Sequence, residues 1–152
     1  MLCKKRFWDK VQKTDTCWLW TASKTRKGYG QFALNGKMVS AHRLSYEDTF
    51  GPIPTGLKLD HTCHVKHCVK PQHLQPATTK KNAENLKGAH KDNLTGVRGV
   101  AWDKATGKWR ASVCHNYKSH WLGRFDTLDE AEAAVISKRN ELFTNNLIDR
   151  TN

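Results

Sequence analysis

The sequence predicts an α+β protein built from two small modules, residues 1–92 and 93–152. Only 38% of its 152 residues are hydrophobic, which is too few for one large core and favours small modules with an additional staple. The composition also changes near residues 91–96. Lys, His and Cys are frequent before this point, and short alternating segments with one helix follow it.

The first module is expected to consist of short elements. Phe7 and Trp8 indicate a short N-terminal helix. Asn35-Gly36 predicts a hairpin, because this dipeptide accepts the positive φ angles that tight hairpin turns require. The remaining expectations are strands at 29–33, 37–41 and 57–61, a helix at 42–49, and a helix at 78–87 that stops at Gly88.

The second module is expected to form a three-stranded antiparallel sheet with one helix behind it. Thr127 and Glu130 form a capping-box pattern that starts the helix, and apolar residues at helical spacing follow. These apolar positions are Leu128, Ala131, Val135 and Leu142, and the expected strands are 96–102, 108–114 and 119–125.

Alternation along the middle strand separates an apolar face from a polar face. The apolar residues are Trp109, Ala111 and Val113. The polar residues are Arg110, Ser112 and Cys114. We therefore expect the apolar face to pack on the helix and the basic, polar face to remain free for a partner.

The formal net charge of +12 favours a polyanionic partner such as nucleic acid. A membrane partner is disfavoured, because the chain lacks a basic amphipathic helix and any apolar run near the ~20 residues of a bilayer span. The N-terminus also lacks the apolar stretch of a signal peptide. We expect a cytoplasmic protein whose five cysteines serve as metal ligands or free thiols.

Residues 60–73, DHTCHVKHCVKPQH, contain four of the eight histidines and two of the five cysteines. Cys63, Cys68 and His73 lie at regular intervals and suit tetrahedral Zn²⁺. A closed structural site needs a fourth ligand. Cys17 is the best candidate upstream, and Cys3, His64 and His67 are the alternatives.

A second, catalytic site is predicted beside this zinc frame. Asp60 ends a strand and Asn82 lies on the following helix, so their oxygens suit one Mg²⁺ or Mn²⁺ ion with several waters. His61 has an ordinary pKa near about 6.5 and is suited to accept a proton from water. Metal, base and basic surface together indicate phosphodiester hydrolysis.

The order of motifs over residues 15–88 resembles an HNH endonuclease, in particular the zinc-containing branch shared with His-Cys box homing endonucleases. That family has the ββα-metal fold. The resemblance implies that His61 is the general base, that Asp60 and Asn82 hold the catalytic metal, and that Cys17, Cys63, Cys68 and His73 hold the structural zinc. The matching motifs are Cys17-Trp18-Leu19-Trp20, Gly28-Tyr29-Gly30, Ala41-His42-Arg43, Asp60-His61-x-Cys63, Cys68-x2-Pro71-x-His73-Leu74 and Asn82.

One residue departs from the pattern of these nucleases. Lys70 stands before Pro71, where many relatives have an asparagine that braces the loop holding the base. The departure removes neither the base nor a proposed metal ligand. Arg43 follows a position near the scissile phosphate in similar nucleases, and its guanidinium is suited to clamp that phosphate.

Residues 94–143 resemble an AP2 domain, which lays its three-stranded sheet in the major groove of DNA. The resemblance rests on Thr95-Gly96-Val97-Arg98-Gly99-Val100, Gly107-Lys108-Trp109-Arg110-Ala111, Trp121-Leu122-Gly123-Arg124-Phe125 and Asp129-Glu130-Ala131. It implies that double-stranded DNA is the partner. The candidate DNA contacts are Arg98, Trp102, Arg110, Ser112 and Trp121.

The favoured interpretation is a homing-type DNA endonuclease of a phage or bacterium, and the host assignment rests on the resemblance. The first alternative is a non-catalytic, sequence-specific DNA-binding protein with a zinc-stapled N-terminal domain. The second is an RNA-binding or RNA-cleaving protein, which is weaker because the sequence establishes no stacking platform for single strands. The sequence leaves the choice between monomer and homodimer undecided.

Overall fold

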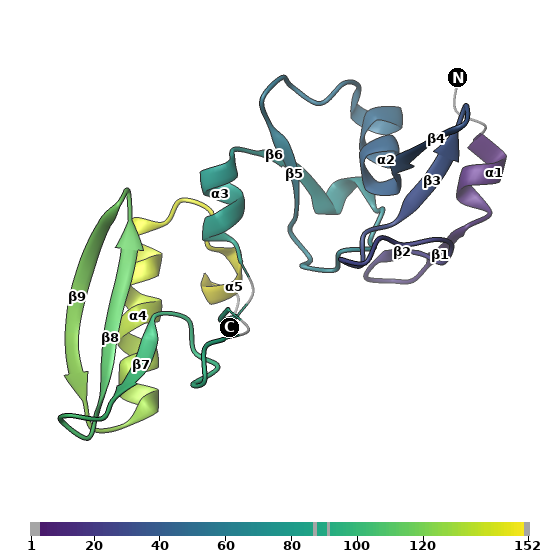
Figure 1. Ribbon diagram of the computed structural model, residues 1–152. Helices are drawn as coiled ribbons and strands as arrows, with labels where there is room; N and C mark the ends of the chain where they lie inside the picture. Colours follow the sequence, from purple (N-terminus) through teal and green to yellow (C-terminus); the bar gives the residue numbers. More distant parts are fainter. Residues whose placement is uncertain (1–3, 87, 91, 151–152) are drawn as a thin grey trace. The chain divides into compact units, whose positions relative to one another are not determined.

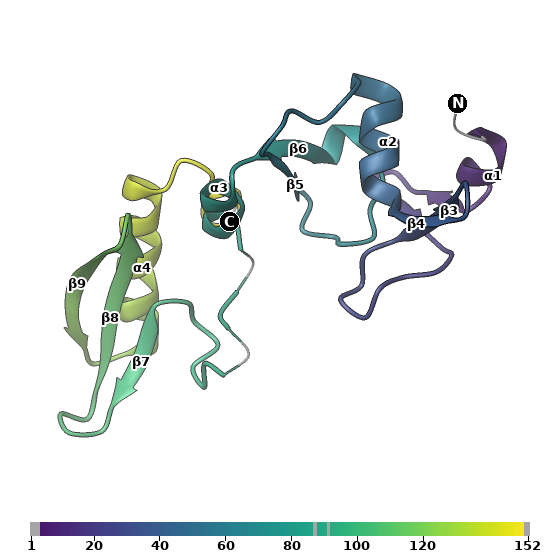
Figure 2. The ribbon, with the colours of Figure 1, turned by 45° about the horizontal axis from the view of Figure 1, so that its top comes forward.

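The computed structural model describes residues 4–86, 88–90 and 92–150 and divides the chain into two compact units, Met1–Thr79 and Lys80–Asn152. Figures 1 and 2 show the ribbon from two directions. The fold is mixed α+β with small antiparallel sheets, as the sequence predicts.

The first unit contains three two-stranded antiparallel sheets. Their strands are β1 (Val11–Lys13) with β2 (Trp18–Trp20), β3 (Gln31–Leu34) with β4 (Lys37–Ser40), and β5 (Lys58–His61) with β6 (Leu74–Ala77). The helices are α1 (Lys4–Trp8), α2 (Ala41–Phe50) and the 3₁₀ turn η1 (Pro71–His73). The strands pair locally in sequence, so short turns fix most of the architecture.

The core of the first unit is small and aromatic. The rings of Phe7, Trp20 and Phe32 lie 5.0–5.9 Å apart and are joined by Ala41, Leu44 and Val69. Gly30 allows this packing, because a Cβ atom there would lie 2.7 Å from the indole of Trp20. One compact aromatic cluster therefore supports α2 and the loops beside it.

The second unit consists of one three-stranded sheet with a helix behind it (Figures 1 and 2). Its elements are α3 (Thr79–Glu84), β7 (Val100–Asp103), β8 (Lys108–His115), β9 (Lys118–Phe125), α4 (Leu128–Leu142) and α5 (Leu147–Arg150). Helix α4 covers one face of the sheet. Its Ala131 and Val135 pack with Ala111 and Val113 of β8, so the predicted apolar face is confirmed.

A β-bulge interrupts the pairing of β8 and β9. Ala111 pairs with Gly123, but the next residue, Ser112, pairs with Trp121, so Leu122 is the extra residue. Gly123 has φ +124°, a value that favours glycine. The bulge changes which side chains of β9 share a face.

Most predicted elements are confirmed, including the hairpin, α2, the capping box of α4 and the sheet. The predicted strand from Gly96 starts only at Val100, because Asn93 and Thr95 side chains hold residues 93–97 in turns. The helix predicted to Lys87 ends at Glu84, and Lys87 itself lies outside the described residues. The short elements β1, β2, β6 and α5 were not predicted.

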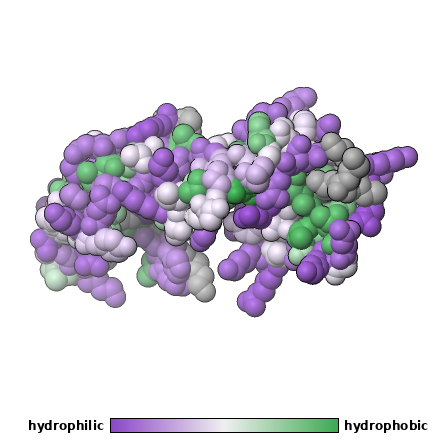
Figure 3. All heavy atoms as spheres, turned by 90° about the horizontal axis from the view of Figure 1, so that it is seen from above, coloured by the Kyte–Doolittle hydropathy of each residue, from purple (hydrophilic) through white to green (hydrophobic). Residues whose placement is uncertain are grey.

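The surface in Figure 3 is mainly hydrophilic, with small hydrophobic patches. In the part of the chain that the structure describes, no helix combines the length and apolar character of a bilayer span. The exposed large apolar side chains are Met38, Phe50, Leu86, Leu94, Trp102, Tyr117 and Trp121.

Candidate functional site

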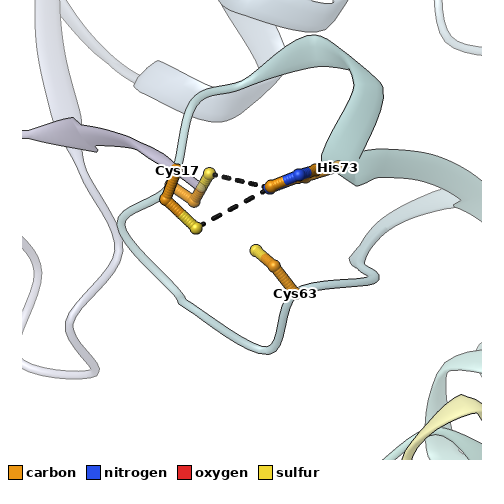
Figure 4. Close-up of side chains that lie close together, drawn as sticks. Cys17, Cys63 and His73 are labelled. Atoms are coloured by element: carbon orange, nitrogen blue, oxygen red, sulfur yellow. Dashed lines mark hydrogen bonds between the residues drawn. The ribbon is translucent and has the colours of Figure 1, made fainter. Parts of the chain in front are cut away.

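Four predicted zinc residues come together in the first unit. The side-chain ligand atoms of Cys17, Cys63, Cys68 and His73 all lie within 4.8 Å of one another. Figure 4 shows Cys17, Cys63 and His73 pointing toward a common centre. The alternative ligands His64 and His67 are not in this cluster, and Cys3 lies outside the described residues.

The distances in this cluster fit a tetrahedral zinc site. The Nδ1 atom of His73 lies 3.7 Å from the sulfur of Cys17 and 3.6 Å from that of Cys68. Bonds of about 2.3 Å to sulfur and about 2.1 Å to nitrogen place two tetrahedral ligands roughly 3.6 Å apart. The Cys₃His donor set is also one that Zn²⁺ prefers, so these residues can hold it.

The pKa shifts of the three thiols also favour a bound cation. The pKa of Cys68 is lowered to about 4 by a hydrogen bond from the Cys63 thiol, with further help from the Lys70 amide. The pKa of Cys63 is raised, first by its bond to Cys68 and then by burial. Burial also raises the pKa of Cys17. Without a cation the cluster supports one thiolate, whereas zinc would allow all three to ionise.

Backbone hydrogen bonds hold the segment 62–73, called the zinc loop here, against β2. The Trp20 amide donates to the His67 carbonyl at 2.9 Å, and the Val69 amide donates to the Trp18 carbonyl at 2.7 Å. Lys70 adds a bond from its Nζ to the Thr16 carbonyl at 3.2 Å. The residue that departs from the family pattern therefore ties the zinc loop to the segment before Cys17.

The candidate base, His61, is attached to this loop. Its Nε2 lies 3.1 Å from the backbone oxygen of Cys68. A carbonyl only accepts, so Nε2 carries the proton and donates, which leaves Nδ1 as the basic nitrogen of the neutral ring. Burial lowers the pKa of His61, so the ring is neutral near pH 7.

Two further aromatic side chains surround the base. The ring centre of His42 lies 5.0 Å from that of His61. The ring centre of Tyr29 lies 6.0 Å from that of His61 and 5.7 Å from that of His42. Burial lowers the pKa of His42 to about 3, with smaller effects of His61 and Arg43. Its Nδ1 is buried without a hydrogen-bond partner among the described residues. Sequence reasoning left His42 undecided, and this cluster places it beside the candidate base, His61.

Asp60 precedes the base on β5 and is buried. Its Oδ2 accepts a hydrogen bond of 3.3 Å from Gln75 Nε2, across the pairing of β5 with β6. Gln75 was missed by sequence reasoning, because β6 itself was not predicted. A carboxylate at a strand end is a suitable ligand for Mg²⁺.

The other two predicted catalytic residues are placed differently. Arg43 lies in the first turn of α2, and its exposed guanidinium is 3.9 Å from Glu47. Asn82 lies on α3, which belongs to the second unit apart from its first residue, Thr79. A shared metal site of Asp60 and Asn82 therefore remains a prediction from the sequence.

The basic face of the sheet in the second unit carries most of the candidate DNA contacts. Arg110 is exposed, Trp121 is 55% exposed, and Ser112 lies opposite Trp121. These three residues line one depression of about 440 Å³. Trp102 is 45% exposed and stacks edge-on against Trp109 at 4.8 Å.

Arg124 is a further cation on this face, and its Nε donates to Asp103 Oδ2 at 2.9 Å. It lies opposite Arg110, and its guanidinium lies 5.4 Å from the ring centre of Trp121. Strict alternation puts residues 121 and 124 on opposite faces, but the bulge brings them to the same one. Gly123 was the signal in the sequence, because an isolated glycine in a strand often marks a bulge.

Arg98, also a candidate DNA contact, already makes hydrogen bonds within the protein. Its guanidinium donates to the backbone oxygens of Glu84 and Ala83, each at 3.1 Å. These oxygens end helix α3. A DNA contact of Arg98 remains a prediction.

Comparison with known families matches residues 39–84 to the HNH endonuclease family and residues 95–144 to the AP2 domain. The predicted order of the two resemblances is thereby confirmed. The predicted boundary at 92/93 falls between the two matched regions and stays a prediction, whereas packing divides the chain after Thr79. No solved structure matches the chain.

Three curated proteins of Escherichia phage T7 are similar to this chain, and their names state no activity. Protein 3.8 is 33% identical over 117 residues, which cover 77% of this chain and 93% of that protein. Protein 7.7 is 42% identical over 72 residues, and Protein 2.8 is 29% identical over 89 residues. The chain spans only 55% of Protein 7.7 and 60% of Protein 2.8.

Proposed function

We propose that this chain is a metal-dependent, homing-type DNA endonuclease. It belongs to the family of phage T7 Protein 3.8, and it joins an HNH endonuclease domain to an AP2 domain. The substrate is a phosphodiester bond of double-stranded DNA. The relatives come from a phage of Escherichia, so we place its action in the cytoplasm of an infected bacterium.

The observation that carries this proposal is the hydrogen bond between His61 and the backbone of Cys68. The zinc loop fixes the ring and its tautomer, so Nδ1 is ready to accept a proton. In the reaction, Nδ1 takes a proton from water while the water oxygen attacks phosphorus. The bond from phosphorus to the leaving 3′ oxygen then breaks.

The remaining predicted catalytic and zinc residues have supporting roles in this proposal. Asp60 and Asn82 hold Mg²⁺ or Mn²⁺, which would neutralise charge on the phosphate and the leaving oxygen. Arg43 binds a phosphate oxygen with its exposed guanidinium. Cys17, Cys63, Cys68 and His73 hold structural zinc.

The sheet of the second unit directs the chain to a duplex. Arg110, Ser112, Trp102 and Trp121 contact DNA, and Arg98 is the fifth predicted contact. Arginine binds guanine edges or phosphates, and both modes suit an exposed strand. One active site per chain cuts one strand at a time, so a double-strand break requires a homodimer or two visits by a monomer.

Cleavage of a supercoiled plasmid carrying the native target tests the proposal. We expect nicking with Mg²⁺, none with EDTA, and a loss of at least about 100-fold in His61→Ala, the usual contribution of a general base. The matched control is His90→Ala, because His90 is exposed and outside the cluster. Binding without cleavage in both Mg²⁺ and Mn²⁺ would refute the enzyme and favour a non-catalytic DNA-binding protein.

A further inference from the structure

Helix α3 cannot account for its own stability. It has only six residues, and Glu84 is the buried one among them. Isolated helices shorter than about 12 residues are marginal in water, and the last four carbonyls of any helix lack partners within it. Support for α3 must therefore come from other parts of the unit.

The carbonyl end of α3 is capped by two side chains from the AP2 region and its C-terminal extension. Arg98 donates to the oxygens of Ala83 and Glu84, as described above. Asn145 donates from Nδ2 to the Lys81 oxygen at 3.1 Å. The positive charge of Arg98 also complements the negative end of the helix dipole.

The carboxylate of Glu84 makes a second set of contacts. It is 4% exposed, and its Oε2 accepts from the Thr144 amide at 3.0 Å, the Thr144 hydroxyl at 3.2 Å and the Asn145 amide at 3.2 Å. Asn85 follows with Oδ1 accepting from the Leu147 amide at 3.2 Å. Hydrogen bonds to a buried charge are stronger than those between neutral groups.

These partners are continuous with the core behind the sheet. Phe143 is buried in that core, and Thr144 and Asn145 follow it directly. Arg98 lies over the Phe143 ring at 5.4 Å, and its backbone oxygen accepts from Arg139 at 3.0 Å. The contacts on α3 thus start from the packed core of the unit.

We propose that Glu84, Asn85, Arg98, Thr144 and Asn145 form an α3 clamp through which the AP2 unit positions Asn82 for metal binding. This inference rests on the proposed function, in which Asn82 is a metal ligand. The HNH match ends at Glu84 and the AP2 match begins at residue 95. Hydrogen bonds nevertheless join Glu84 to Arg98 and Thr144 of the AP2 region. The AP2 unit is then required for cleavage itself and is more than a targeting module.

Glu84→Ala in the full chain tests the clamp with two independent measurements. Hydrogen exchange should accelerate at amides 80–85 by about tenfold or more, because the helix opens locally. The single-turnover cleavage rate on saturating DNA should fall at least about tenfold, since small misplacements of a catalytic group are costly. The Mg²⁺ concentration at half-maximal rate should rise, and the DNA dissociation constant should stay within about threefold.

Two other variants keep the test decisive. Glu84→Gln retains an acceptor oxygen for Thr144 and Asn145, so we expect near wild-type exchange and rate. Leu86→Ala is the control just beyond the same helix, because its side chain is 54% exposed. If Glu84→Ala unfolds the unit, Asn145→Ala replaces it, since this change removes the bond from Nδ2 to the Lys81 oxygen and keeps the backbone amide that donates to Glu84.

Each outcome decides one step. Unchanged exchange at 80–85 in Glu84→Ala overturns the clamp. Faster exchange with an unchanged cleavage rate and Mg²⁺ requirement overturns the positioning of Asn82. A wild-type chain that never cleaves overturns the proposed function and the catalytic half of this inference, while the exchange measurement still decides whether the clamp holds α3.

Discussion

The two units of this chain are stabilised in different ways. The first has an aromatic cluster centred on Trp20, sheets of only two strands, and a Cys₃His cluster. The second has a three-stranded sheet packed on α4, with buried Val135 and Ala131 in between. A two-stranded sheet is marginal alone, whereas three strands against a helix form an independent core.

This difference matches the function that we propose for each unit. The first unit holds polar side chains at its candidate site, where Asp60 and His61 are buried and the ring of His42 lies 5.0 Å from that of His61. Buried polar groups reduce the apolar area that is available to stabilise the fold. Zinc in the Cys₃His cluster would supply the missing stability, and the backbone of Cys68 in this cluster also holds His61. The second unit presents a flat polar face, so its whole opposite face is available for the core.

Removal of zinc should affect the two units most differently. With a strong chelator, we expect the first unit to unfold and the second to remain folded, because structural zinc contributes on the order of 10 kcal/mol in small zinc domains. Amide NMR spectra should lose dispersion only for residues of the first unit. Elemental analysis of the untreated protein should give one zinc per chain.

The matched pair for this prediction is Cys68→Ser against Cys114→Ser. Cys68 is buried in the cluster, whereas Cys114 is an exposed free thiol on the outer face of β8. We expect the first variant to reproduce the effect of the chelator and the second to resemble wild type. A folded first unit in the zinc-free protein would show that its aromatic core is sufficient.

Gly99→Ala should produce the next largest effect, now in the second unit. Gly99 has φ +90°, and a Cβ atom there would lie 2.6 Å from the backbone oxygen of Ser112. Left-handed strain together with this overlap should lower the free energy of unfolding of the unit by about 3 kcal/mol. Chemical denaturation followed by the fluorescence of tryptophans 102, 109 and 121 measures it.

Gly107→Ala separates the two causes. Gly107 also has a positive φ, of +65°, but a Cβ atom there meets nothing within 4 Å. We expect a loss of about 1 kcal/mol from the backbone conformation alone. Equal losses at both glycines would mean that the contact with Ser112 contributes nothing. Neither change should alter the zinc content of the first unit.

The sequence predicted the second unit better than the first, for a physical reason. Alternation in residues 108–114 and the Thr127 capping box are local signals, and both survive unchanged in the fold. The bulge at Leu122 depends on how two strands pair, so it was missed, and Arg124 was missed with it. The bonds of Arg98 to α3 were not predicted, because these partners are distant in sequence.

In the first unit, the regular spacing of Cys63, Cys68 and His73 was sufficient to predict a metal cluster. Cys17 could only be ranked above the alternatives, because its approach depends on the pairing of β2 with residues 67–69. The environment of His61 also depends on this pairing, so its link to Cys68 was invisible in the sequence. Local patterns predicted the candidate ligands, whereas non-local backbone contacts determine the surroundings of His61.

The stability of the first unit should also depend on pH, because His42 lies in this unit. The pKa of His42 is about 3 in the folded chain and about 6.5 when unfolded, so the unfolded state binds the proton more readily. Stability from His42 is complete above pH 6.5 and falls below it by up to ~1.4 kcal/mol per pH unit. Denaturation of the zinc-loaded chain between pH 7 and 5 should show this loss.

His42→Gln should show a flatter dependence over the same range, because glutamine does not titrate. The control is His90→Gln, which replaces a histidine that is 76% exposed. Parallel curves for wild type and His42→Gln would contradict the buried neutral state. The second unit, measured in the same samples by its own NMR signals, should show no difference among the three proteins.

The capping box of α4 should give the smallest effect and tests how local the stability of the second unit is. Thr127 Oγ1 accepts from the Glu130 amide at 3.2 Å, and Glu130 Oε2 accepts from the Thr127 amide at 3.2 Å. Thr127→Ala should lower the free energy of unfolding by about 1 kcal/mol, the usual contribution of an N-cap. Glu130→Ala removes only the reciprocal bond and should cost about half as much. Thermal unfolding of the second unit distinguishes the two variants. A loss above about 3 kcal/mol for Thr127→Ala would mean that the helix start also determines the packing of α4 on the sheet, so that a local signal carries the stability of the whole unit.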